Sequence, residues 1–111
     1  MKYDLENIFA KILRKEIPCD KIFEDENVLC FKDINPQAKL HILIIPKKPF
    51  IDIVDFLENA EIEYQSSFWN SVNKIIKKLD LNDKGFQLKS HKGTDGGQEV
   101  FHFHLHILSK S

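Results

Sequence analysis

Hydrophobic and polar residues alternate strictly over residues 101–107 and Leu108 follows, so that residues 101–108 read Phe-His-Phe-His-Leu-His-Ile-Leu. Alternation with a period of two predicts a β-strand whose two faces have different surroundings. One face would carry apolar side chains suited to a core, and the other would carry His102, His104 and His106. Imidazoles add little to a core because each has polar nitrogens to satisfy. We therefore interpret the histidine face as a functional surface.

The first part of the chain predicts one short helix followed by a hairpin. Apolar residues recur at helical spacing over residues 5–13, with Asp4 as the expected N-cap and Pro18 beyond the end. Residues 21–24 and 28–31 flank a turn-forming segment, so we expect two antiparallel strands there. The helical stripe needs no explanation beyond packing against the core.

The middle of the chain predicts a central strand, a long helix and a further strand. Residues 40–45 are apolar apart from His41, which suits a strand covered on both faces. A later helical stripe predicts a long helix that begins near residues 59–61, whereas residues 51–58 are ambiguous. The apolar positions of the stripe are Phe68, Trp69, Val72, Ile75, Ile76 and Leu79. Alternation over residues 84–90 predicts a strand that precedes the histidine strand in the sequence.

The order of these elements indicates a single α+β domain over residues 1–111. Short connections favour antiparallel neighbours, so we predict a five-stranded antiparallel sheet with two helices. A chain of 111 residues has the length of one domain and is long enough to bury a core.

The composition limits the kinds of partner that the protein is expected to bind and the cellular compartment in which it is expected. The net charge is −1, from 16 basic and 17 acidic residues, so no global basic field favours nucleic acid. No apolar stretch has the length of a signal peptide or a membrane span. Two cysteines in such a chain are expected to be reduced thiols. We therefore expect a cytoplasmic protein with no nucleic-acid or membrane partner.

The histidine face suggests nucleophilic chemistry. A neutral imidazole is a nucleophile near pH 7, and a row of imidazoles can orient one member and deliver a proton. Residues 92–98 hold three of the four glycines of the chain and form a loop that leads into the predicted strand. Free N–H groups in such a loop can bind an anion. Together these features suggest attack on the phosphorus of a charged ester.

Metal binding is the main alternative to nucleophilic chemistry on the histidine face. Two histidines at positions i and i+2 of a strand can share a zinc ion, and His41 or His91 could supply a third ligand. However, no thiolate lies near the strand in the sequence, and a zinc site would leave the glycine loop unexplained. A single histidine would be read as structural, but three in register favour a functional role over a structural one.

Several segments then resemble the histidine triad (HIT) nucleotide-binding proteins. Residues 100–108 look like the triad motif of alternating histidines, and residues 8–18 resemble the opening helix of that family. Residues 31–38 and 41–48 resemble its two middle segments. Residues 93–98 are similar to the Hint branch, the purine nucleoside phosphoramidases. The resemblance covers almost the whole chain.

The resemblance implies a mechanism without a cofactor. His104 would attack the α-phosphorus of a nucleotide and form a covalent nucleotidyl-histidine, which water would hydrolyse to the nucleoside monophosphate. His106 and His41 would hold His104 in its reactive tautomer. His102 would lie beside the phosphate, where it would help to bind it or protonate the leaving amine.

The resemblance also implies a purine nucleotide site. Asp33 matches the acid that binds the ribose hydroxyls, and Gln98 and Val100 match nucleotide-binding positions. His91 stands where the Hint branch has asparagine, and Glu99 stands where it has serine, so the preference for a leaving group is open. An apolar slot for the base is implied at Phe9, Ile12, Phe31, Ile34 and Leu43.

The expected function is hydrolysis of purine nucleoside 5′-phosphoramidates. Three alternatives stay open: hydrolysis of dinucleoside polyphosphates, AMP binding without catalysis in a sensor or scaffold protein, and a zinc protein. The resemblance further implies a homodimer that joins two sheets into one through the longer helix and a strand.

Overall fold

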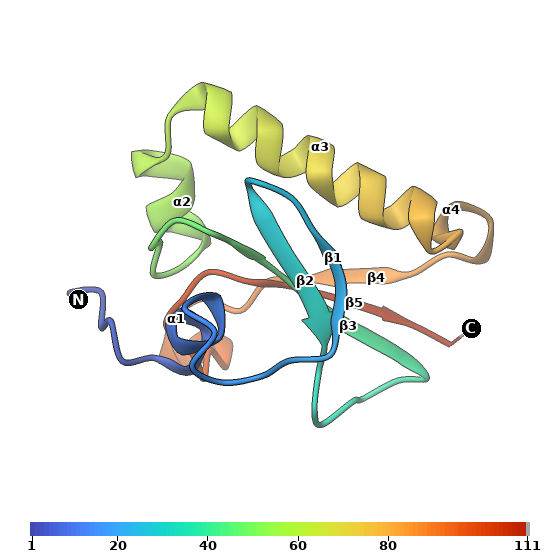
Figure 1. Ribbon diagram of the computed structural model, residues 1–111, viewed down its shortest axis with the longest axis horizontal. Helices are drawn as coiled ribbons and strands as arrows, with labels where there is room; N and C mark the ends of the chain where they lie inside the picture. Colours follow the sequence, from blue (N-terminus) through green and yellow to red (C-terminus); the bar gives the residue numbers. More distant parts are fainter. Residues whose placement is uncertain (111) are drawn as a thin grey trace.

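The computed structural model describes residues 1–110 and has one mixed-length antiparallel sheet with helices on both faces (Figure 1). The strand order is β1-β2-β3-β5-β4, and every neighbouring pair is antiparallel. The predicted five-stranded antiparallel sheet is confirmed. The strands are β1 Lys21–Glu24, β2 Val28–Lys32, β3 Leu40–Pro46, β4 Gln87–Lys89 and β5 Leu105–Ser109.

The described chain has more helical segments than the two that the sequence predicts. The ambiguous segment forms a helix, because the Asp52 side chain accepts a hydrogen bond from the Asp55 N–H and caps its first turn. A short helix also follows Asp80, which has a left-handed φ of 55°. The helices are α1 Ile8–Leu13, α2 Ile53–Asn59, α3 Ile62–Lys78 and α4 Leu81–Lys84, with a 3₁₀ turn η1 at Thr94–Gly96.

Helix α3 covers one face of the sheet and forms the larger core with it (Figure 1). Its Phe68, Val72 and Ile75 are buried, as the helical stripe predicts. Trp69 differs from that prediction, since 37% of its surface is exposed at the margin of the stripe. The sheet contributes side chains that alternate along the central strands, including Ile42 and Ile107.

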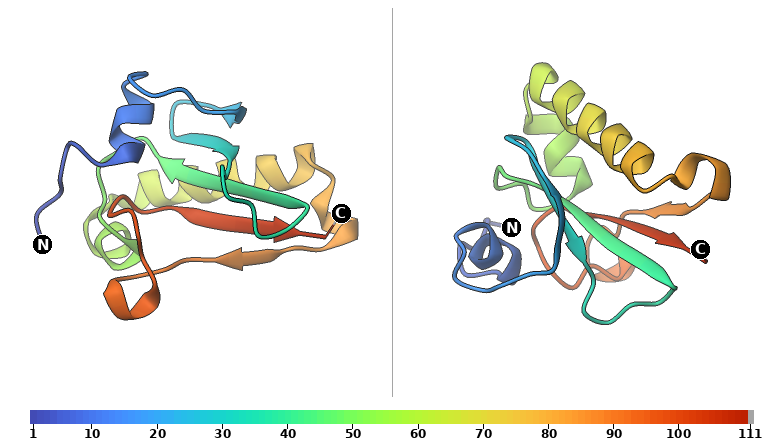
Figure 2. Two further views of the ribbon diagram at one scale, coloured as in Figure 1. Left: turned by 90° about the horizontal axis from the view of Figure 1, so that it is seen from below. Right: turned by 45° about the vertical axis from the view of Figure 1, so that its right-hand side comes forward.

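Helix α1 covers the opposite face of the sheet (Figure 2). Its Phe9 and Ile12 pack on side chains of β2 and β3 that include Phe31 and Leu43. The predicted N-cap at Asp4 is wrong, because the Asn7 side chain accepts from the Ala10 N–H and caps the helix. This smaller apolar cluster is where α1 meets the sheet face that carries His41 and His106.

The strand predicted over residues 101–108 begins only at Leu105. The Phe103 N–H donates to the carbonyl of Phe50 at 2.7 Å, so this part of the chain bonds to the loop after β3 rather than joining the sheet ladder. The apolar half of the alternation still packs as expected for Phe103, Leu105 and Ile107, which lie in the larger core. Phe101 is half-buried and lies outside that core.

Strand β4 is shorter than predicted and forms one edge of the sheet. Helix α4 takes the start of the predicted strand, and Gly85 ends that helix with a φ of 83°. All three residues of β4 are exposed, including Leu88 at 47%, and the neighbouring Phe86 is 36% exposed. An exposed edge strand of this kind offers unpaired backbone groups to another chain.

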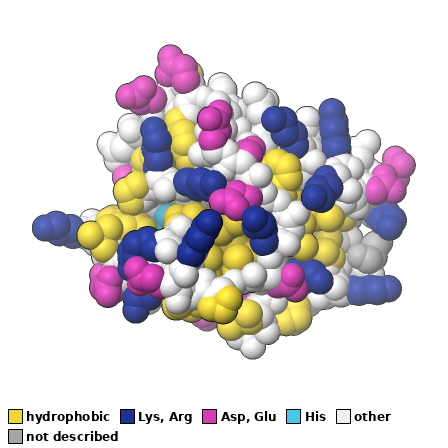
Figure 3. Space-filling view, viewed as in Figure 1, with side chains coloured by type: hydrophobic (Ala, Val, Ile, Leu, Met, Phe, Trp, Pro, Cys, Tyr) yellow, Lys and Arg dark blue, Asp and Glu magenta, His cyan; other side chains and the backbone are white. Residues whose placement is uncertain are grey.

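Three further observations bear on the composition analysis. Cys19 and Cys30 are both free thiols, as expected. No helix within residues 1–110 is long and apolar enough to cross a membrane. On the face shown in Figure 3, basic and acidic side chains are interspersed with apolar ones, so that face has no continuous basic field.

Candidate active site

All five histidines of the chain gather at the end of the sheet where α1 and the segment before β5 meet. The His106 ring is the centre of the group. Its centroid lies 5.2 Å from that of His41, 5.0 Å from that of His104 and 4.9 Å from that of His91. His102 joins the group through its backbone carbonyl, which contacts the His104 ring.

A hydrogen-bonded chain assigns the tautomers of His41 and His106. The backbone N–H of Gln37 donates to Nδ1 of His41 at 3.0 Å, so the proton of that neutral ring lies on Nε2. Nε2 of His41 lies 2.9 Å from Nδ1 of His106 and donates to it. His106 therefore carries its own proton on Nε2. Register places these residues on neighbouring strands, with His41 opposite Leu108 and His106 opposite Leu43.

Nε2 of His106 is a buried donor without a partner among residues 1–110. Such a group costs free energy in a folded protein unless a ligand or water satisfies it. An N–H aimed into a site is the group expected where a negatively charged oxygen binds. This nitrogen therefore marks a place for an anionic oxygen beside the other imidazoles.

The His104 ring is held in the tautomer that a nucleophile requires. Its Nδ1 lies 2.6 Å from the carbonyl oxygen of His102, which can only accept, so Nδ1 carries the proton. Nε2 consequently carries the lone pair. Phe9 packs against the ring in an edge-to-face contact, with centroids 4.9 Å apart. The His104 side chain is almost buried, which removes competing water from the ring.

The His102 ring is fixed at both nitrogens and is fully buried. Nε2 donates to the carbonyl oxygen of Pro46 at 2.9 Å, and Nδ1 accepts from the Tyr3 hydroxyl at 2.6 Å. This placement corrects the expectation that His102 binds the phosphate or protonates a leaving group, because no ring nitrogen is free to do so. The sequence gives no sign of the Tyr3 contact, since 99 positions separate the two residues.

Burial keeps the histidines of the triad neutral. Desolvation and, to a smaller extent, the nearby His104 lower the pKa of His102 to about 4, although the hydrogen bond to the Pro46 carbonyl raises it. Desolvation, followed by the neighbouring His104, His91 and His41, lowers the pKa of His106 to about 4. The pKa of His104 is lowered by the same cause. At neutral pH the Nε2 lone pair of His104 is therefore available.

The positions implied for the base are only partly brought together. Phe9, Ile12, Phe31 and Leu43 form the buried cluster between α1 and the sheet, and Phe9 links that cluster to His104. Ile34 lies apart from them on the loop after β2, with 86% of its surface exposed.

Asp33 faces His41 rather than open solvent. Its Oδ2 lies 3.4 Å from Nε2 of His41, and its Oδ1 accepts from the backbone N–H of Asn35. The carboxylate therefore lies at the histidine group, beside the loop that carries Ile34.

The glycine loop is closed by its own hydrogen bonds. The N–H groups of Gly96 and Gly97 donate to carbonyls within the loop, and that of Gly93 donates to the Gln98 side chain. The same Gln98 donates to Ile51 and Val100 carbonyls, so it ties the loop to the body of the protein. The expectation that the glycine N–H groups form an anion cradle is therefore wrong.

Open N–H groups are found immediately after the glycine loop instead. Among residues 1–110, no hydrogen bond uses the backbone N–H of Glu99 or Val100. The Val100 side chain packs against the cluster that contains Phe9, which places this peptide near the His104 ring. The Glu99 side chain is exposed.

His91 contributes a ring without a fixed tautomer. It contacts His106, and it has no hydrogen bond with any residue of 1–110. His91 is half-buried, in contrast to the almost fully buried His102 and His104.

Within residues 1–110, Asp33, His41 and His106 are the residues whose arrangement could hold a metal ion, since one ligand atom from each lies within 4.8 Å of the others. The nitrogens that face one another there, Nε2 of His41 and Nδ1 of His106, already share a proton. In these tautomers Nε2 of His41 has no lone pair to offer. A cation would therefore have to displace the Gln37 contact that sets the tautomer.

Comparison with known proteins identifies the family to which this chain is related. The family profile of the HIT domain matches residues 14–111. An uncharacterised HIT-like protein of Rickettsia prowazekii (strain Madrid E) is 42% identical over 106 residues, which cover 96% of this chain and 88% of the relative.

Solved structures agree with this assignment. The HIT family hydrolase of Legionella pneumophila Philadelphia 1 superposes with a TM-score of 0.86 and 39% identity, over 96% of this chain and 94% of that one. The histidine triad nucleotide-binding protein of Candida albicans gives a TM-score of 0.80 and 33% identity, over 92% and 73%. The chain belongs to the HIT family.

Proposed function

We propose that this protein is a nucleotide-binding hydrolase that cleaves purine nucleoside 5′-phosphoramidates through a covalent intermediate on His104. One observation carries the proposal: the His102 carbonyl holds the proton of His104 on Nδ1, which leaves the Nε2 lone pair free on a neutral ring. The unpartnered Nε2–H of His106 lies on the adjacent ring. A nucleophile next to an unsatisfied donor suits attack at a phosphoryl group.

The reaction would proceed in two steps. Nε2 of His104 attacks the α-phosphorus, the phosphorus–nitrogen bond to the leaving amine breaks, and the amine departs with that electron pair and a proton taken from solvent. Nε2–H of His106 donates to a phosphoryl oxygen as negative charge develops there. Water then attacks phosphorus and gives up a proton to solvent, the bond to His104 breaks and returns its electron pair to Nε2, and the nucleoside monophosphate is released.

The neighbouring residues suggest how the nucleotide would lie. The base would contact the apolar cluster of Phe9, Ile12, Phe31 and Leu43, with Ile34 as a wall on the exposed loop. Asp33 would bind the ribose hydroxyls, since it is the carboxylate at the end of this cluster. The N–H groups of Glu99 and Val100 would bind the phosphate, and the Gln98 side chain would support that peptide.

Two observations point to different leaving groups. The exposed Glu99 carboxylate follows the glycine loop directly and would attract the cationic end of an amine. In contrast, a cavity of about 700 Å³ beside Gln87 and Leu108 is lined by four basic side chains, which would attract an anion. These are Lys39, Lys84, Lys89 and Lys110.

The lysine cavity supports a second candidate, hydrolysis of dinucleoside polyphosphates. Lys89 lies opposite His106 in the ladder between β4 and β5, so both side chains project from the same face of the sheet. A polyphosphate leaving group could extend along that face towards the lysines. The two candidates share the attack by His104 and differ only in the leaving group.

The test is turnover of a fluorogenic adenosine 5′-phosphoramidate and of diadenosine triphosphate by one preparation. Wild-type protein should release AMP from the phosphoramidate, and His104→Ala should not. Lys32→Ala, at an exposed residue of β2, serves as the matched control. Equal rates for wild type and His104→Ala would reject the proposal, and AMP binding without turnover would support the non-catalytic alternative. Faster cleavage of the triphosphate would favour the second candidate.

A homodimer is also proposed, through β4 and α3. Strand β4 leaves one edge of the sheet without a partner strand within residues 1–110, and Leu88 and Phe86 are exposed along it. Trp69 of α3 is also partly exposed. Pairing of two β4 edges would cover these side chains and continue the sheet into a second copy.

A further inference from the structure

A tyrosine far from the triad in sequence contacts its first histidine. The Tyr3 hydroxyl lies 2.6 Å from Nδ1 of His102, and Nε2 of the same ring lies 2.9 Å from the Pro46 carbonyl. The carbonyl can only accept, so Nε2 carries the proton and Tyr3 must donate to Nδ1. The His102 ring is thus held between the N-terminal arm, residues 1–7, and the end of β3.

The backbone of His102 in turn orients the nucleophile. Its carbonyl oxygen lies 2.6 Å from Nδ1 of His104. The N–H of the same peptide group belongs to Phe103 and donates to the Phe50 carbonyl at 2.7 Å. Both the carbonyl and the N–H of this peptide are therefore held by hydrogen bonds. The His102 side chain next to it is held by Tyr3 and Pro46.

We propose that Tyr3 is a positioning residue for His104, acting through His102 and its carbonyl. This inference rests on the proposed function, because it assigns Tyr3 to the orientation of the attacking ring. Without the hydroxyl, Nδ1 of His102 would be a buried acceptor with no partner. The ring would shift or change its contacts to recover one, and the carbonyl that fixes the His104 tautomer would move with it.

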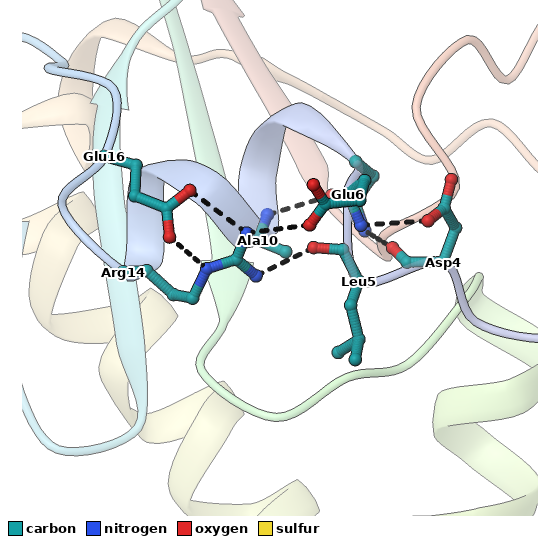
Figure 4. Close-up of polar contacts among 7 residues, drawn as sticks. Asp4, Leu5, Glu6, Ala10, Arg14 and Glu16 are labelled. Carbon is teal, nitrogen blue, oxygen red and sulfur yellow. Dashed lines mark hydrogen bonds and ion pairs between the residues drawn. The ribbon is translucent and has the colours of Figure 1, made fainter.

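The N-terminal arm is built to hold Tyr3 in place. Arg14, the residue immediately after α1, donates to the Leu5 carbonyl at 2.7 Å and forms ion pairs with Glu6 and Glu16 (Figure 4). These contacts tie the arm to the end of the helix. The Asp4 side chain accepts from the Glu6 N–H and closes a turn. The HIT profile matches residues 14–111, so Tyr3 precedes the residues that the profile matches.

The experiment compares wild type with Tyr3→Phe, which removes only the hydroxyl. Single-turnover measurements with the adenosine phosphoramidate should show nucleotidylation of His104 slowed on the order of tenfold to a hundredfold. The dissociation constant for AMP should stay the same, since Tyr3 does not contact the proposed nucleotide site. Nitrogen-15 NMR of the histidine rings should show the Nδ1 signal of His102 and the signals of His104 shifted, with those of His41 unchanged.

Two controls separate positioning from a general loss of stability. Lys2→Ala changes the same arm at an exposed residue, and Val72→Ala weakens the core under α3, away from the histidines. Both should keep the wild-type nucleotidylation rate. A Tyr3→Phe variant with a wild-type rate and unchanged ring signals would overturn the inference. If wild type itself forms no nucleotidyl-histidine, the proposed function fails, and the ring signals of Tyr3→Phe still decide whether Tyr3 sets the His104 tautomer.

Discussion

His41 and His106 lie on neighbouring strands, and the proton between them belongs to His41. The distance from His41 Nε2 to His106 Nδ1 is 2.9 Å, and the Gln37 N–H occupies the other nitrogen of His41. A backbone N–H on the loop before β3 therefore determines which nitrogen of His106 faces the site. The result is a donor, rather than a lone pair, next to His104.

Replacing His41 should reverse this arrangement. In His41→Ala, nothing donates to Nδ1 of His106, so its proton can move there and Nε2 presents a lone pair to the phosphoryl oxygen. We expect nucleotidylation to slow on the order of a hundredfold, as for loss of a donor to developing charge. Stopped-flow kinetics would measure the rate, and nitrogen-15 NMR would report the His106 tautomer. An unchanged tautomer in the variant would contradict the relay.

The buried histidines should make the fold sensitive to acid. The pKa of His102 is about 4 in the folded protein and about 6.5 when the chain unfolds, so the unfolded state binds more protons below pH 6.5. The contribution of neutral His102 to the free energy of unfolding should be fully present above about pH 6.5 and should fall as the pH decreases towards 4. The loss from His102 would be on the order of 3 kcal/mol.

Urea unfolding between about pH 7 and pH 4 would measure this loss. An NMR titration of the His102 ring in the folded protein is the accompanying check. A flat stability across that range, or a ring that titrates near pH 6.5, would show that the site does not keep His102 neutral.

The Asp33 carboxylate could act on the ribose hydroxyls or on His41, and binding of ligands with and without those hydroxyls distinguishes the two. If it binds the ribose hydroxyls, Asp33→Asn should weaken AMP binding on the order of tenfold, because a charged hydrogen bond is lost. Binding of 2′,3′-dideoxy-AMP should change little. Isothermal titration with both ligands measures the difference. Equal losses for the two would mean that Asp33 acts through His41 alone, which it approaches at 3.4 Å.

The β4 edge should control assembly. Leu88→Lys places a charge on the exposed edge strand and should convert the proposed dimer to a monomer, because edge lysines oppose strand pairing. Light scattering after size-exclusion chromatography gives the mass. Val54→Lys, at a residue of α2 that is 38% exposed, should leave the mass unchanged. A wild-type protein with the mass of one chain would end this proposal.

The sequence predicts most of the sheet because burial follows alternation. Ile42, Leu105 and Ile107 occupy the core face that their spacing indicates. The boundary of the last strand could not be predicted, since it depends on a bond from Phe103 to Phe50, far away in the chain. The same limit applies to the cap of α1, where Asp4 and Asn7 are both good capping residues and only the local turn decides.

The sequence predicts which residues form the candidate site better than it predicts what each of them does there. Alternation identifies His102, His104 and His106 as a group, but it does not show that α1 and Tyr3 cover them. His102 therefore has a position that sequence reasoning cannot assign, because its partners lie at the opposite end of the chain and after β3. Glycines in the loop likewise suggest open N–H groups, yet their bonds close within the loop.

Attack of His104 Nε2 on phosphorus would leave a nucleotidyl group on that ring. The most direct measurement is mass spectrometry of protein quenched during turnover of the adenosine phosphoramidate, with the modified residue located by peptide mapping. We expect one added adenylyl group on His104 in wild type and none in His104→Ala. Turnover with an unmodified His104 at every time point, or an adduct on another histidine, would contradict it.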